Sequence, residues 1–155
     1  ERAAWEAWKA SLRGGLKSFV THDTSRKELI AYPNGVPQIA AGTWNGQGAA
    51  TAVAAHTITA SGAPNGFKLM PGDLIGLQAG NPLRRWVGFV SEEATAGAST
   101  IAVPVEPALP TTIFGIGATV VFYRPQAEFI LLSDTWSCSK RDFLAPVSFE
   151  AVQKI

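Results

Sequence analysis

In the stretch FKLMPGDLIGLQAGNPLRRWVGFV, residues 67–90, two short alternating segments lie on either side of a turn, and this pattern predicts the fold class of the chain. Apolar side chains alternate with polar or small ones at 67–69 and again at 86–90, which is the period of a half-buried β-strand. Between these segments, Pro71 and Gly72 suit the two central positions of a type II turn. Short strands joined by such turns predict an antiparallel sheet.

The same pattern continues on both sides of this stretch. Short strands at this spacing, separated by turn residues and without a long helix, are typical of an antiparallel barrel or sandwich. We therefore predict a mainly β protein with antiparallel β-sandwich or barrel lobes. The further strand candidates are 56–60, 74–77, 100–103 and 119–123, and after Pro125 also 128–132, 136–138 and 147–152.

The N-terminal segment predicts one amphipathic helix. Trp5, Trp8 and Leu12 are spaced three and four residues apart, so they form one apolar stripe on a helix. Gly14 and Gly15 follow directly and can adopt the left-handed conformation that ends a helix. No initiator Met, capping residue or signal peptide precedes the first apolar residue. We therefore expect a chain that was trimmed or that begins partway through a larger domain.

The first and last segments of the chain complement each other. The strands after Pro125 need an apolar surface to cover them, and the helical stripe provides one. We predict a discontinuous lobe formed by residues 1–38 and 125–155, with residues 56–124 inserted as a β-barrel-like lobe. Residues 39–55 are dominated by Ala, Gly and Thr, which predicts a small-residue connector, a flat strand, or an arm that orders against a neighbour.

The composition argues against several classes of partner. The formal net charge is +1 and 16% of the residues are charged, so the chain lacks the broad cationic field that binds nucleic acid. No apolar run approaches the length of about 20 residues that crosses a bilayer. The isolated basic pairs Arg84 and Arg85, and Lys140 and Arg141, predict solvated edges or a rim of contacts to another protein.

Few residues could form a catalytic or metal site. His22 lies beside Asp23 in a predicted turn without an accompanying nucleophile, and His56 has no Cys or second His at ligand spacing. Glu92 and Glu93 are adjacent, so in an extended chain they point to opposite faces and cannot act on one glycosidic bond. We therefore predict a protein that is not an enzyme and that uses no cofactor or metal.

Two tryptophans are candidates for a binding surface. Trp44 lies in a predicted loop, and Trp86 follows Arg84 and Arg85 in an alternating strand. An exposed indole ring offers a flat face to a sugar ring or to a protein partner. The alternating pattern around Trp86 also fits a core position. A carbohydrate-binding β-module that uses Trp44 or Trp86 is therefore one alternative function.

Several short motifs follow one another along nearly the whole chain. They are Trp-x-x-Trp-x-x-x-Leu-x-Gly-Gly at 5–15, Leu-Met-Pro-Gly-Asp-Leu-Ile at 69–75, Ile-Ala-Val-Pro at 101–104 and Ser-Phe-Glu-Ala-Val at 148–152. In this order the motifs resemble the distal tail proteins of long-tailed bacteriophages and related tail-like particles. Members of that family normally have several strands before the helix, and those strands are missing from this chain.

The resemblance implies a structural role. It implies a β-rich collar lobe assembled as a ring, usually hexameric, that joins the tail tube protein to the baseplate hub protein. The middle block would then be an outward lobe that attaches side fibres or binds host-surface glycan. The protein would be located in the virion tail tip after assembly in the cytoplasm of the bacterial host. A tail-associated glycan hydrolase is the second alternative, and it would need converging carboxylates that the sequence does not display.

Overall fold

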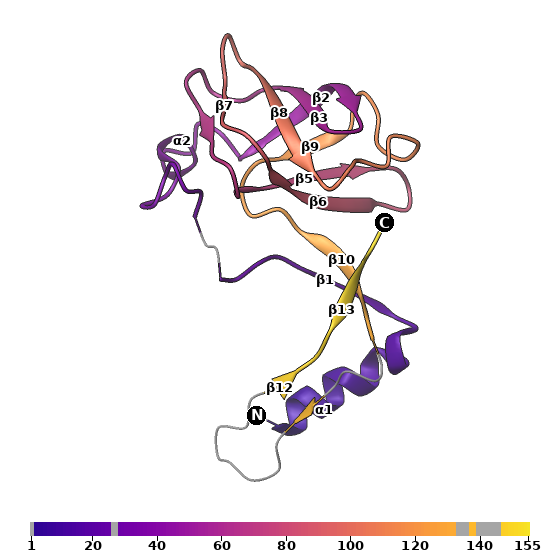
Figure 1. Cartoon of the computed structure of the whole chain (residues 1–155). Coiled ribbons are helices and arrows are strands. Elements are labelled where there is room, and N and C mark those ends of the chain that lie inside the picture. Colours follow the sequence, from indigo (N-terminus) through magenta and orange to yellow (C-terminus); the bar gives the residue numbers. More distant parts are fainter. Residues whose placement is uncertain (1, 26–27, 133–136, 139–146) are drawn as a thin grey trace. The chain divides into compact units, whose positions relative to one another are not determined.

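The computed structural model describes residues 2–25, 28–132, 137–138 and 147–155. The chain divides into two compact units (Figure 1). The helix–sheet unit consists of Glu1–Thr21 and Ala127–Ile155, and the barrel unit consists of His22–Gln126. The chain therefore contributes to the helix–sheet unit twice, and the barrel unit is inserted between the two contributions.

The barrel unit is built around a closed antiparallel barrel of six strands (Figure 1). Neighbouring strands pair in the order β2-β3-β8-β6-β5-β9, and β9 pairs with β2 to close the barrel. The elements of this unit are α2 (Pro37–Ala40), β2 (Gln47–Ala54), β3 (Thr57–Ser61), β4 (Lys68–Leu69), β5 (Leu74–Ala79), β6 (Arg84–Val90), β7 (Ala94–Thr95), β8 (Thr100–Glu106) and β9 (Thr119–Val121).

One side of each long strand fills the barrel interior. Strand β3 buries Ile58 and Ala60, while the polar residues at the alternate positions of the strand are only partly covered. Leu77 of β5 lies opposite Trp86 of β6, and both side chains are at most 1% exposed. Burying these side chains in the closed barrel stabilises the fold through the hydrophobic effect. Burial also fixes the strand register, because a shift of one residue would turn the same side chains toward solvent.

Gly88 is required by the way in which Trp86 packs. The two residues are two positions apart on β6, so they share one face of the strand. The indole ring of Trp86 occupies the space into which a Cβ of residue 88 would project. The same Cβ would lie 2.7 Å from the carbonyl oxygen of Glu106. Trp86 can therefore lie along its own strand only because residue 88 has no side chain.

We predict that Gly88→Ala lowers the free energy of unfolding by about 1–3 kcal/mol, because the added methyl group displaces the Trp86 ring. Chemical denaturation followed by circular dichroism measures the change. Gly115→Ala is the matched control, since a Cβ at residue 115 meets no atom within 4 Å. Equal effects of the two substitutions would contradict the packing described for Trp86.

The helix–sheet unit combines helix α1 with a three-stranded antiparallel sheet (Figure 1). Strand β10 lies between β1 and β13, and Phe129 of β10 is opposite both Phe19 and Gln153. The elements are α1 (Arg2–Ser11), the 3₁₀ turn η1 (Arg13–Gly15), β1 (Ser18–Thr21), β10 (Ala127–Leu131) and β13 (Ala151–Lys154), with a separate pair formed by β11 (Ser137–Cys138) and β12 (Val147–Ser148).

Aromatic rings hold α1 to the sheet. The ring centroid of Trp8 lies 5.2 Å from that of Phe19 and 5.4 Å from that of Phe149. Leu12 is buried, whereas Trp5 is 43% exposed and contacts Trp8 edge-on. Aromatic pairs at these separations contribute more than their buried area alone. The stripe of α1 therefore packs firmly at its C-terminal end and less completely at its N-terminal end.

The end of α1 is fixed by two glycines. Gly14 and Gly15 have φ angles of +64° and +91°, a conformation that costs other residues energy. The N–H of Lys17 donates to the carbonyl oxygen of Leu12 at 3.1 Å, which satisfies a backbone acceptor at the helix end. A Cβ on Gly15 would also overlap the carbonyl oxygen of Leu131. Gly15 thus allows the chain to turn closely against β10.

The structure confirms the predicted fold class, a mainly β protein with an antiparallel barrel and an N-terminal helix. The boundary between the units differs from our prediction, because residues 22–38 belong to the barrel unit and not to the lobe that contains the helix. Leu29 and Val36 are buried in the barrel core, and the ring of Tyr32 stacks on Phe67 at 5.6 Å. These side chains enter the core from loops, so they produce no periodic sequence signal.

Residues 39–55 are not a connector. Strand β2 occupies residues 47–54 of this segment and pairs with both β3 and β9, so the flat strand is the alternative that the structure shows. A Cβ on Gly48 would overlap the carbonyl oxygen of Ser61 and would lie 3.0 Å from the Phe122 ring. The small residues therefore allow close approach between strands. In the described ranges, none of the helices reaches the length and hydropathy of a membrane-spanning segment.

Candidate functional site

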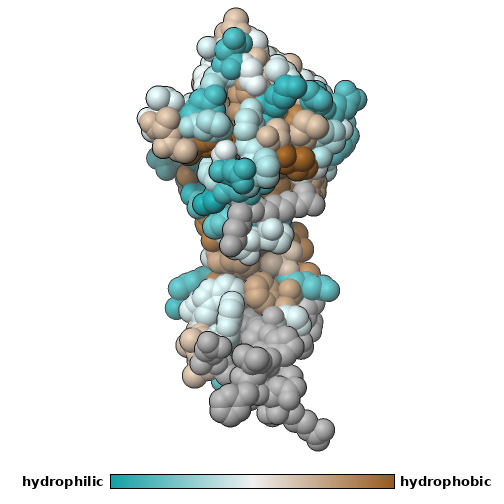
Figure 2. Space-filling model, turned by 90° about the vertical axis from the view of Figure 1, so that its left-hand side faces the viewer, coloured by the Kyte–Doolittle hydropathy of each residue, from teal (hydrophilic) through white to brown (hydrophobic). Residues whose placement is uncertain are grey.

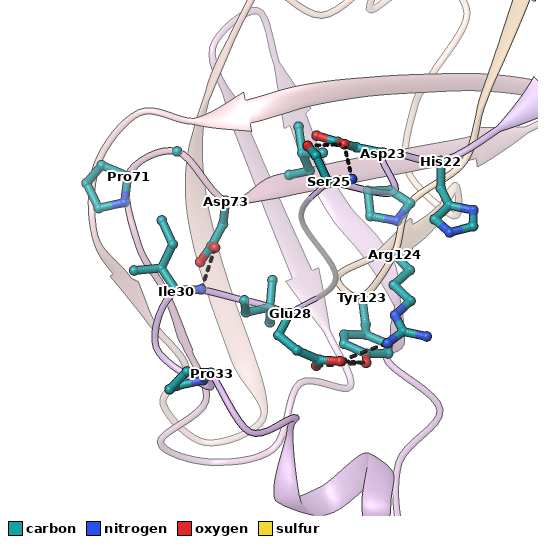
Figure 3. Close-up of a pocket in the computed structure, with 14 residues that line it drawn as sticks. His22, Asp23, Ser25, Glu28, Ile30, Pro33, Pro71, Asp73, Tyr123 and Arg124 are labelled. Carbon is teal, nitrogen blue, oxygen red and sulfur yellow. Dashed lines mark hydrogen bonds and ion pairs between the residues drawn. The ribbon is translucent and has the colours of Figure 1, made fainter. Parts of the chain in front are cut away.

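The barrel unit contains a pocket of about 650 Å³ (Figure 3). Its described walls come from residues 22–25 and 28–33, from the turn at 71–74, and from residues 123–125. Proline rings and aliphatic side chains alternate there with carboxylate, hydroxyl, imidazole and guanidinium groups. The volume and the mixed lining are those of sites that bind small molecules.

Asp73 fixes one wall of this pocket. Its side chain is 4% exposed, and its two carboxylate oxygens accept the N–H groups of Ile30 and Met70 at 2.9 and 2.8 Å. Pro71 and Gly72 occupy the centre of the adjoining turn, which the Asp73 N–H closes by donating to the Met70 carbonyl at 3.0 Å. A buried carboxylate thus joins the turn to a segment that lies far away in sequence (Figure 3).

We predict that Asp73→Ala destabilises the barrel unit by about 1–3 kcal/mol for each N–H group that is left without an acceptor. Amide hydrogen exchange at Ile30 and Met70 should become faster together with this loss. Asp73→Asn keeps one acceptor oxygen, so its effect should be smaller. Unchanged protection of the Ile30 amide in Asp73→Ala would show that this bond does not hold the wall.

Glu28, Tyr123 and Arg124 form the polar centre of the pocket. The Tyr123 hydroxyl donates to the Glu28 carboxylate, with oxygen separations of 2.9 and 2.8 Å, and an Arg124 guanidinium nitrogen donates to the same carboxylate at 2.8 Å. The guanidinium carbon of Arg124 also lies 4.8 Å from the centre of the Tyr123 ring. The three groups are therefore held against one another before any ligand arrives (Figure 3).

Arg124 has an unusual backbone for its residue type, with φ at +50°. A residue with a Cβ adopts this conformation only when its surroundings enforce it, and such residues are concentrated at functional sites. The ion pair with Glu28 and the contact with the Tyr123 ring are the interactions that oppose this cost. The backbone of Arg124 thus supports the pocket as the candidate site of the barrel unit.

Burial raises the pKa of the Tyr123 hydroxyl above its usual value, and the hydrogen bond to Glu28 acts in the same direction, while the charge of Arg124 opposes them. The pKa of Tyr123 is therefore higher in the folded protein than in the unfolded chain, where it is about 10. Below that pH the hydroxyl is neutral in both states, and its full contribution to the free energy of unfolding is present. We predict that this contribution is lost as the pH rises from there through the folded pKa. Tyr123→Phe should remove this part of the alkaline destabilisation.

The sequence has two tyrosines, so absorbance titration of the Tyr32→Phe variant reports Tyr123 alone. The phenol should ionise at a higher pH in the folded variant than in the same variant in denaturant. Ionisation at the same pH in both states would contradict the raised pKa.

The helix–sheet unit contains a second hollow of about 630 Å³, which we call the aromatic groove. None of its described lining residues is charged, so its chemistry differs from that of the barrel pocket. Its shape follows from the incomplete packing at the N-terminal end of α1. The groove is lined by Ala4, Trp5, Trp8, Phe19, Val20, Thr21, Phe129, Phe149 and Ala151.

The helix–sheet unit exposes several apolar side chains, most of them outside the lining of the aromatic groove. Leu16 is 86% exposed and Val152 is 54% exposed, and Val20, Leu132 and Ile155 are each more than 40% exposed. On the visible face of the barrel unit in Figure 2, hydrophilic side chains (teal) surround smaller apolar areas (brown). The helix–sheet unit therefore combines few strands with many exposed apolar side chains, a combination that marks interaction sites.

The structure shows that Trp86 cannot be a binding surface, and it shows that Trp44 packs against the barrel core. Trp86 is 1% exposed inside the barrel, so it presents no face to a sugar or to a partner. Trp44 is partly buried, with its ring 4.8 Å from that of Phe67, and its indole N–H donates to the Gln47 carbonyl at 2.8 Å. Both rings are used for packing because the alternating strand and the loop each direct them toward the barrel core.

The basic pairs have different outcomes. Arg84 is exposed and Arg85 is partly buried on β6, and neither lines the barrel pocket. Lys140 and Arg141 lie outside the described residues. The partner contacts predicted for these four side chains therefore stay predictions.

The barrel pocket was missed by sequence reasoning. The Pro-Gly turn predicted from the sequence is followed by Asp73, whose carboxylate accepts the N–H of Met70 nearby and that of Ile30, which is 43 positions away. Glu28 and Tyr123 are 95 positions apart. No spacing rule connects residues at such separations, so only the closed barrel reveals them as neighbours.

Comparisons of the chain with protein-family models, with curated proteins and with solved structures give no significant match. The barrel pocket is suited to a small polar ligand, and the aromatic groove is suited to an uncharged apolar surface. No group of three or more His, Cys, Asp or Glu in the described part of the chain could hold a metal ion.

Proposed function

We propose that this protein is a structural component of a bacteriophage tail tip, and that its helix–sheet unit assembles with copies of itself and with neighbouring tail proteins. The aromatic groove is the observation that carries the proposal. It exposes Trp5 beside Phe19 and Phe129 without any charged residue among its described lining. Aromatic residues are enriched in the buried centres of protein interfaces, where charged residues are depleted.

The architecture of the helix–sheet unit also supports assembly. Its sheet has three strands, and β1 and β13 are the outer ones in the described part of the chain. Such a small sheet buries little apolar area by itself, and outer strands tend to pair with other chains. Burial against a neighbour would cover the exposed side chains and stabilise both subunits.

The resemblance in motif order supplies the identity of the assembly. In this proposal identical subunits form a ring, hexameric in most members of the family, between the tail tube protein and the baseplate hub protein. Cyclic symmetry lets each subunit bury one patch against a different patch of the next subunit. The barrel unit has its own closed core, so it can carry a separate attachment function toward side fibres or the host surface.

We predict that the purified protein forms rings, visible by electron microscopy, and that Trp5→Ser weakens their association about tenfold, because it removes an exposed aromatic side chain from the groove. Light scattering over a concentration series measures the association. Ile116→Ser is the matched control, since Ile116 is an 80% exposed apolar residue of the barrel unit.

A wild-type protein that stays monomeric at high concentration and does not bind tail-tube protein would contradict the proposal. Equal weakening by Trp5→Ser and Ile116→Ser would show that the aromatic groove has no special role in assembly.

A further inference from the structure

The barrel unit contains three Asn-Gly dipeptides in turns or loops. Each asparagine is exposed, and each following glycine has a positive φ, at +91°, +76° and +77° in chain order. Such dipeptides are common in turns because glycine adopts this backbone without cost. The three pairs are Asn34 and Gly35, Asn45 and Gly46, and Asn65 and Gly66.

An Asn-Gly dipeptide can modify itself without an enzyme. The backbone nitrogen of the glycine attacks the side-chain carbonyl carbon of the asparagine, so a new C–N bond closes a succinimide ring and the bond to the side-chain nitrogen breaks. The amide proton of the glycine leaves with that nitrogen as ammonia. Water then opens the ring to give either aspartate or isoaspartate. The backbone nitrogen must lose its proton and approach the side chain, so a hydrogen bond from that N–H to a carbonyl opposes the reaction.

The structure distinguishes the three dipeptides by this hydrogen bond. The Gly35 N–H donates to the Tyr32 carbonyl at 3.0 Å, and the Gly66 N–H donates to the Ala96 carbonyl at 2.9 Å. The Gly46 N–H has no acceptor among the described residues. Two of the three nucleophiles are therefore held in backbone hydrogen bonds, and the nitrogen of Gly46 is not.

The side chain of Asn45 is also prepared for the attack. Its Oδ1 atom accepts the N–H of Gln47 at 3.0 Å. A donor at this position polarises the carbonyl group and stabilises the negative charge that develops on the oxygen when the nitrogen adds. Gly46 is packed against Tyr123 and Ile39, whereas Asn45 is exposed, so the side chain is the partner that moves.

We propose that Asn45 and Gly46 form a site of spontaneous deamidation in the folded protein. The modification affects the closure of the barrel. The Gly46 carbonyl accepts the Phe122 N–H at 2.9 Å, and Gln47 is paired with Val121 at the start of β2. Isoaspartate adds one carbon atom to the main chain at residue 45, so it shifts the point at which β2 joins β9.

The test follows all three dipeptides in one sample. The folded protein is incubated at neutral to mildly alkaline pH, and peptide mapping by mass spectrometry records the loss of each side-chain amide over time. Asn45 should react several-fold faster than Asn34 and Asn65, because at those two sites the glycine N–H must first give up a hydrogen bond before its nitrogen can attack. In denaturant the three rates should become similar, because the same dipeptide then lacks its folded surroundings.

Two controls complete the experiment. Enzymatic methylation of isoaspartyl groups should label the wild-type protein with age and should label Asn45→Gln several-fold less, because only the slower dipeptides at Asn34 and Asn65 remain in that variant. Asn45→Asp supplies the new charge without the longer main chain, so the Phe122 amide should exchange faster in aged wild-type protein than in this variant. Equal rates at the three sites in the folded protein, or faster reaction at Asn34 or Asn65, would overturn the proposal.

Discussion

Closure of the barrel depends on β9, a strand of only three residues. Its residues pair with β2 on one side and with β5 on the other. Without it, both longer strands would leave backbone N–H and C=O groups unpaired next to an apolar interior, which is costly. Val120, at the centre of β9, points inward and is fully buried. One short strand therefore completes both the hydrogen bonding and the core.

The barrel pocket is a consequence of this closure. After β9 the chain passes through the buried Phe122 into Tyr123, Arg124 and Pro125. A Cβ on Gly76 of β5 would lie 2.7 Å from the Cβ of Pro125. The pairing of β9 with β5 thus places the Tyr123 hydroxyl within reach of Glu28. Asp73 holds the opposite wall by its bonds to backbone N–H groups. Short local segments become one polar site because the barrel fixes their ends.

The insertion of the barrel unit follows a simple constraint. Thr21, the last residue of β1, is the direct antiparallel partner of Ala127, the first residue of β10. Paired residues in antiparallel strands have Cα atoms about 5 Å apart. An inserted unit that begins at residue 22 and ends at residue 126 must therefore bring its own ends close together. Because its two ends meet, the inserted barrel can fold around a core of its own. The two units can then carry different functions.

Elements with a local signal can be predicted from the amino-acid sequence without knowledge of the fold. The stripe of Trp5, Trp8 and Leu12 and the glycine pair after it specify a helix and its end, and alternating apolar residues specify most of the strands. These signals depend on residues within one or two turns of each other, so they can be read without knowing the fold. Long-range packing, in contrast, assigns β2 to the barrel and residues 22–38 to the barrel unit, and it turns Trp86 toward the core. It also decided which side chains surround the pocket, because contacts such as that between Glu28 and Tyr123 exist only when the barrel brings distant segments together.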